Sequence, residues 1–159
     1  MIPAANNHVS VAEITHVEKW AEYNNLLLNF KKSVEIAFVP PRSRWAVVLP
    51  VSAIPKIARV ESIKALGVTF SRKFSITRHV ENLLALCAQT LFALCTLRQH
   101  GLPTSTLHAI FHTTVVAKQS YASSAWWVFT CADDRKRLAA FLRRSARHGY
   151  RNASDPKLP

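Results

Sequence analysis

The sequence predicts an α+β fold that is mainly helical, with a small β-containing part followed by a three-helix bundle. Glycine is scarce, at 3 of 159 residues, and the apolar residues fall mostly in long stretches, a pattern that favours helices. The composition changes near Phe74, from mixed strand and helix to helix alone. Because the chain is 49% hydrophobic and 19% charged, it is long and apolar enough for one domain with a core.

The first predicted helix spans about residues 11–24. Ser10 and Glu13 have the spacing of a capping box at its start. Apolar residues then recur at helical intervals, and Asn24-Asn25 ends the periodic segment.

Short strands are predicted at 26–29 and at 34–38, where apolar residues alternate in the second segment. The polar segment between them would let the two strands pair as a hairpin, with Lys31 and Lys32 near the turn. Prolines stop the second strand, and we interpret the stretch up to Pro55 as a loop or a weak edge strand.

A longer strand is predicted from Arg59 to Phe70. Its apolar alternation changes phase near Ala65, which indicates an irregularity before Gly67. Glycine at that position can adopt backbone angles, or allow a close approach, that a side chain would forbid.

Three amphipathic helices are predicted in the remainder. Glycines end two of them, and Asp133 and Asp134 lie in the first turn of the last. The first of these helices runs from Ser75 or Thr77 to Gly101. The second starts just after Pro103 and continues through a bend near 120–124. The third runs from Thr130 or Cys131 to Gly149. The predicted core face of the first helix holds Ile76, Val80, Leu83, Leu84, Cys87, Leu91, Leu94 and Cys95. The domains expected are therefore 1–74 and 75–151, with a tail at 152–159.

The net charge of +12, from 21 Lys and Arg against 9 Asp and Glu, predicts a polyanionic partner. Nucleic acid is favoured over an anionic membrane, because we expect no apolar run that approaches the ~18 residues of a spanning helix. The strongest basic feature is the last helix, which would contact phosphates without reading sequence. Its candidate residues are Arg135, Lys136, Arg137, Arg143, Arg144, Arg147 and Arg151. A solvated basic surface with no dedicated ligand is the open alternative.

The cysteine pattern is typical of a reduced intracellular protein. Cys87 and Cys95 lie on one predicted helix, about 12 Å apart at 1.5 Å per residue, too far to bridge. Cys131 leaves an odd count, and no spacing resembles a zinc site. The N-terminal residues lack the features of a secretory signal, so an intracellular location is expected, without a choice between nucleus and cytoplasm.

Three segments occur in an informative order: Leu28-Asn29-Phe30-Lys31-Lys32-Ser33, Ala65-Leu66-Gly67-Val68, and the aromatic run that ends at Trp127. Together they resemble the part of a non-LTR (LINE-type) retrotransposon reverse transcriptase that follows its catalytic aspartates. The resemblance covers about residues 2–151. It implies the connection from palm to thumb, followed by the thumb itself.

The resemblance assigns roles to single positions. Lys32 takes the place of the lysine thought to assist proton transfer or to hold the incoming triphosphate. Leu66, Gly67 and Val68 match the primer grip, although Ala65 replaces the usual aromatic residue. Tyr121 and Trp126 take the aromatic places of a later thumb helix, where they would stack on bases. Each of these segments also has an alternative interpretation without a functional role. Lys31 and Lys32 would be solvated lysines of a turn. The grip-like segment would be a buried edge strand, and the aromatic residues would belong to the core.

The segment Cys131-Ala132-Asp133-Asp134 looks like the family's catalytic box, but it follows the lysine segment instead of preceding it. The box also needs a strand hairpin and a third aspartate to hold two magnesium ions. A metal role for His108 and His112, which share a helical face, is not favoured either, because no glutamate lies between them. No catalytic residue, metal site or cofactor is therefore predicted, and Mg²⁺ is expected only in the intact parent polymerase.

The resemblance thus implies a truncated reverse-transcriptase fragment whose chemistry lies upstream of Met1. We expect it to bind an RNA–DNA hybrid or a duplex weakly and without sequence preference, to have no polymerase activity, and to have no membrane or small-molecule partner. The alternatives are a free-standing basic helical module that binds RNA or DNA, and a product that does not fold stably because its strands have lost their partners.

Overall fold

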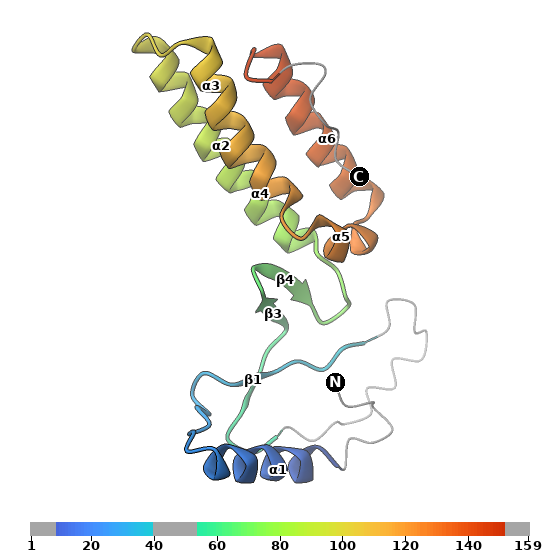
Figure 1. The fold of residues 1–159 in the computed structure, drawn as a ribbon. Coiled ribbons are helices and arrows are strands. Elements are labelled where there is room, and N and C mark those ends of the chain that lie inside the picture. Colours follow the sequence, from blue (N-terminus) through green and yellow to red (C-terminus); the bar gives the residue numbers. More distant parts are fainter. Residues whose placement is uncertain (1–8, 40–53, 152–159) are drawn as a thin grey trace. The chain divides into compact units, whose positions relative to one another are not determined.

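The structure, a computed structural model, describes residues 9–39 and 54–151 (Figure 1). It is mainly helical with a few short strands, as predicted. The chain divides into two compact units, each described here by itself. The N-terminal unit comprises Met1–Lys64 and Ser71–Phe74, and the helical unit comprises Ala65–Phe70 and Ser75–Pro159. The loop or weak edge strand predicted up to Pro55 lies mostly outside the described residues, as does the tail at 152–159.

The N-terminal unit begins with α1, Ser10–Tyr23. The predicted capping box is wrong: Ser10 is already helical, and the N-cap is Val9, with no side-chain cap bond. The predicted end is correct, because Asn24 is the C-cap and Asn25 has a positive φ of 55°. Asparagine tolerates this left-handed conformation better than most residues.

The predicted strand at 26–29 and its hairpin are wrong. Asn29 instead organises a turn, in which its side chain accepts from the Lys32 amide (3.1 Å) and its carbonyl accepts from the Ser33 amide (3.0 Å). Such local bonds compete with strand pairing. Strand β1 is only Val34–Glu35, and it pairs in parallel with β2, Ala58–Arg59.

The predicted strand from Arg59 to Phe70 is two strands, β3 (Ser62–Ala65) and β4 (Val68–Ser71), which form a two-stranded sheet. Leu66 and Gly67 link them with φ of 47° and 85°. Positive φ at both central residues is the pattern of a type I′ hairpin turn. The phase change in the sequence therefore marks a reversal of the chain.

The helical unit contains α2, Thr77–Gln99, which agrees with its predicted limits. Gly101 has a φ of 83°, and the Leu102 amide donates to the carbonyl of Leu97 at 3.1 Å. This bond is that of a Schellman motif, the expected glycine stop. The predicted core face was too broad, because Cys95 is exposed.

The helix predicted to start just after Pro103 is a series of short helical segments, as its predicted bend near 120–124 indicated. They are α3 (Thr104–Phe111), a π-helical turn (His112–Val116), α4 (Ala117–Ser120), α5 (Ser123–Trp126) and a 3₁₀ turn (Trp127–Phe129). The helical winding is interrupted between α4 and α5 at Ala122, whose φ is 50°.

Two threonines of the π turn form side-chain bonds to the turn that precedes it. Its wider winding displaces carbonyls from ordinary i to i−4 bonds. The Thr113 hydroxyl donates to the carbonyl of Ala109 (2.9 Å), and the Thr114 hydroxyl donates to that of Ile110 (2.6 Å). Both threonines therefore supply bonds to carbonyls around the irregularity.

Helix α6, Ala132–Arg147, completes the unit, with Gly149 (φ 72°) just beyond it as predicted. Helix α2 packs against both α3 and α6, and the three lie side by side in Figure 1. The buried core is continuous and comprises Val68, Ile76, Val80, Leu83, Cys87, Leu94, Leu107, Phe111, Val115, Trp126, Leu138, Phe141, Leu142 and Tyr150. Within it, burial raises the pKa of the Cys87 thiol, against the opposing effect of a hydrogen bond from Gln119.

The judgement that no apolar run approaches membrane-spanning length is wrong for α2. By length and composition alone this helix is apolar enough to cross a membrane, with a mean hydropathy of 1.6 in its most apolar window, of which 22% is buried. One such helix is weak evidence for insertion, since core helices of soluble proteins meet the same criterion. The low burial means that much of the apolar surface of α2 is open.

Candidate nucleic-acid interface

The basic residues of α6 lie on different sides of one helix. The buried face of α6 carries Leu138, Leu142 and Ser145. Because a helix turns every 3.6 residues, Lys136, Arg143 and Arg147, spaced seven and four residues apart, share the opposite face. All three are exposed. We call these three residues the outer stripe.

The outer stripe carries no ion pair among the residues that the structure describes. Its three cations therefore face solvent without a carboxylate partner among the described residues. Exposed cationic side chains on one helix face supply affinity for a nucleic-acid backbone without reading its sequence.

Two other predicted residues have structural partners instead. Arg135 donates to Thr130 Oγ1 (2.7 Å) and lies over the Trp127 ring, 5.3 Å from its centroid. Arg137 Nη1 lies 3.6 Å from Glu81 Oε1 and 3.9 Å from Asp134 Oδ1. These contacts hold α6 to its neighbours. Fewer cations are therefore free to face a ligand than we predicted from the sequence.

The remaining two cations of the predicted set differ in exposure. Arg144 is exposed and lies on another side of α6 from the outer stripe, whereas Arg151 follows the helix and is half-buried. The sequence presented these basic residues as one cluster, but in the structure they fall into several groups.

The aspartate pair lies in the first turn of α6, as predicted from the helix dipole. Asp134 is buried, and its Oδ2 accepts from Thr77 Oγ1 at 2.9 Å, which joins the start of α6 to the start of α2. Its amide donates to Cys131 Sγ at 3.4 Å, so Cys131 caps the helix. Asp134 thus has a structural role that the sequence did not reveal.

The segment that resembles a primer grip is the turn between β3 and β4. Leu66 is 91% exposed at its tip, whereas Val68 is buried. The Tyr121 hydroxyl donates to the carbonyl of Leu66 at 3.3 Å, and a Cβ on Gly67 would lie 3.3 Å from the Tyr121 ring. Two of the segments that carry the resemblance therefore meet in the helical unit, a contact that sequence reasoning missed.

The aromatic residues of this region differ in availability. Trp126 is fully buried, and its indole N–H donates to the carbonyl of Tyr121 at 2.8 Å, so it is a core residue and cannot stack on a base. Tyr121 is more than half exposed. Of the two aromatic positions named by the resemblance, only Tyr121 presents a ring to solvent.

Lys31 and Lys32 are exposed in the Asn29 turn of the N-terminal unit. Phe30, in the same turn, has a different lysine over its ring: Lys56 Nζ lies 5.5 Å from the ring centroid. No cluster of three or more His, Cys, Asp or Glu side chains that could hold a metal ion occurs among the described residues.

A scan against family models, a search among curated proteins and a search among solved structures each found no match to this chain.

Proposed function

We propose that this chain corresponds to the palm–thumb connection and thumb of a LINE-type reverse transcriptase, and that it binds nucleic-acid backbones without catalysing polymerisation. The observation that carries the binding proposal is the outer stripe, Lys136, Arg143 and Arg147 on the solvent face of α6. Its natural ligand is an RNA–DNA hybrid or a duplex, whose phosphates are regularly spaced.

The contact of Tyr121 with the Leu66-Gly67 turn supports the thumb assignment. In the parent family, the corresponding turn presses on the primer, and the helices that follow run along the duplex. A turn held by an aromatic residue of the thumb would keep these two nucleic-acid contacts in fixed register.

The binding is expected to be weak and sensitive to salt. Each neutralised phosphate releases counterions and contributes about −0.9 to the slope of log K against log salt for a duplex. Three contacts therefore give a slope of roughly −3. Lysine and arginine contacts to phosphate carry no sequence information, so different sequences should bind alike.

The test is fluorescence anisotropy with a labelled RNA–DNA hybrid. The variant K136E/R143E/R147E should bind at least about tenfold more weakly. Its matched control is K19E/K73E/K118E, which changes the net charge equally at three other exposed lysines. The control should retain most of the affinity; equal losses in both variants would contradict a localised site.

A primer-extension assay with Mg²⁺ tests the absence of polymerase activity. Asp133 and Asp134 lie at a helix start, and Asp134 is engaged with Thr77, so we expect no incorporation. Incorporation above background would refute this part of the proposal.

A free-standing basic module would use the same outer stripe. The genomic DNA upstream of the first codon distinguishes it from a fragment. A codon run for aromatic-Ala-Asp-Asp there, in frame or frameshifted, favours the fragment, whereas a promoter with an untranslated leader favours the module.

A further inference from the structure

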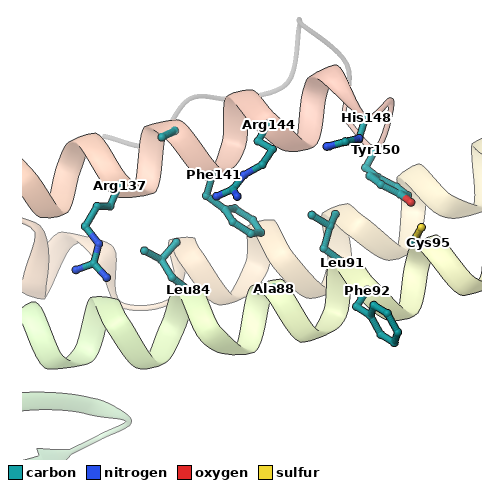
Figure 2. Close-up of a pocket in the computed structure, with 11 residues that line it drawn as sticks. Leu84, Ala88, Leu91, Phe92, Cys95, Arg137, Phe141, Arg144, His148 and Tyr150 are labelled. Carbon is teal, nitrogen blue, oxygen red and sulfur yellow. The ribbon is translucent and has the colours of Figure 1, made fainter.

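A groove runs between α2 and α6 (Figure 2), with a volume of about 510 Å³. Its lining is mainly apolar, with cationic side chains along one wall. We infer that this groove is a docking site for an acidic amphipathic helix of a partner protein. This inference goes beyond nucleic-acid binding and uses a different side of α6.

The two walls have the geometry that receives another helix. The groove is lined on α2 at 84, 88, 91, 92 and 95, and on α6 and its C-cap at 137, 140, 141, 144 and 148. In both rows four of these positions, 84, 88, 91 and 95 and then 137, 141, 144 and 148, follow a spacing of four, three and four residues. This is the heptad spacing that forms holes for the knobs of a neighbouring helix. A further helix could thus pack along both rows at once.

The chemistry of the two walls differs. The α2 row is Leu84, Ala88, Leu91 and Cys95, which offers no charge. The facing row is Arg137, Phe141 and Arg144 of α6, followed by His148 at its C-cap. An occupant therefore needs apolar residues toward α2 and acidic residues toward α6.

The arginines set the spacing of the acidic residues. Arg137 and Arg144 are seven residues apart, about 10.5 Å along the helix. Arg137 already has Glu81 and Asp134 nearby, at 3.6 and 3.9 Å. Arg144 has no carboxylate within 4.0 Å among the described residues, so it is the stronger attachment point. Carboxylates one heptad apart on the docked helix would meet both arginines.

A further cation lies at one end of the groove. Arg98 stacks on the ring of Tyr150, with its guanidinium carbon 3.9 Å from the ring centroid, and Tyr150 itself lines the groove. The positive charge therefore extends along the groove, beside an apolar floor that phosphates would not occupy favourably. This combination favours an acidic amphipathic helix over a nucleic acid.

The probe is a fluorescent helical peptide of about three heptads, with leucine at its a and d positions and glutamate at e and g. A matched peptide has lysine in place of every glutamate. The full chain should bind the acidic peptide at least about tenfold more tightly than the basic one. Equal binding of the two peptides would overturn the inference.

The principal variant is Arg144→Glu, and its matched control is Arg143→Glu on the outer stripe. Arg144→Glu should weaken binding of the acidic peptide at least about tenfold and improve binding of the basic peptide. Arg143→Glu should change either affinity less than about threefold. If the two variants behave alike, the groove does not select the peptide.

A second variant tests the apolar wall independently of charge. Ala88→Trp places a large side chain in the groove, and circular dichroism checks that the helices persist. Loss of peptide binding with retained hybrid binding is the expected result. Unchanged peptide binding by Ala88→Trp, or full displacement of the peptide by the hybrid, would overturn the proposed site.

Discussion

The two units of this chain differ most in how many of their side chains are buried. Every member of the continuous hydrophobic core belongs to the helical unit. In the described part of the N-terminal unit, only Ser10 and Ala21 are buried, whereas Leu27 is 95% exposed. The comparison teaches that one unit has its own core, whereas the described residues of the other form elements that share none.

Strand length explains part of the difference. Strands β1 and β2 have two residues each, and two-stranded pairs are at best marginally stable in water. The ion pair between Arg59 and Glu35, at 2.8 Å, is partly exposed and contributes little. The helical unit, in contrast, buries side chains from α2, α3 and α6 against one another.

Hydrogen exchange of the full chain should give the largest contrast between the units. Amides in α2 and α6 should exchange only when the core opens, roughly 10³-fold or more slowly than those of residues 26–38. Mass spectrometry of peptides after timed labelling measures this ratio. Strong protection of 26–38 in a monomer would break the comparison.

Two tryptophans provide the next test. Trp126→Ala removes a fully buried ring of the helical unit and should cost about 3–5 kcal/mol in the free energy of unfolding. Trp20→Ala in α1, where the side chain is 57% exposed, should change it by less than about 0.5 kcal/mol. Urea unfolding followed by circular dichroism compares them, and similar losses would show that α1 is part of the same core.

The link between Thr77 and Asp134 tests how the ends of α2 and α6 are joined. Thr77→Val leaves a buried carboxylate oxygen without its hydroxyl donor and should destabilise the helical unit by about 1.5–3 kcal/mol. Asp133→Asn, which changes an exposed carboxylate at the same helix start, should cost about 0.3–1 kcal/mol. The same unfolding experiment measures both, and an equal effect would assign the stability to the helix dipole alone.

A glycine pair sharpens the description of the hairpin turn. Gly67 and Gly101 have similar positive φ values, 85° and 83°, but only Gly67 has a neighbour that a Cβ would meet, the Tyr121 ring. Both alanine variants should lose about 1–2 kcal/mol from the left-handed backbone. Gly67→Ala should lose more, and its excess over Gly101→Ala in thermal unfolding measures the contact with Tyr121.

The sequence predicted the helices better than the strands. Helical periodicity and glycine stops located α2 and α6 to within a few residues, because long amphipathic segments repeat the same signal many times. Two-residue strands carry no such signal. Near residue 29, the asparagine side chain determined the backbone instead, and apolar alternation could not reveal this.

The sequence predicted which basic residues belong to the candidate site, but not how they are arranged around α6. The sequence located the seven cations near the last helix, yet only the packing of α6 separates the outer stripe from Arg135 and Arg137, which are engaged with neighbours. The role of Asp134 depends on Thr77, which is 57 residues away in sequence. Contacts between distant positions leave no local pattern from which to predict them.

The π turn accommodates one residue more than a regular α-helix would hold at the same place. Leu107, Phe111, Val115 and Gln119 are all buried at intervals of four; in a regular α-helix that interval drifts about 40° each time, and the wider winding at 112–116 offsets the drift. Deleting one codon at 112–114 would make the turn regular and change the buried spacing to four, three and four residues, which still keeps one helix face inward. Gln119 and Tyr121 would then keep their places, so a three-nucleotide deletion should be tolerated here, whereas the same loss within a regular helix rotates all later positions by about 100°.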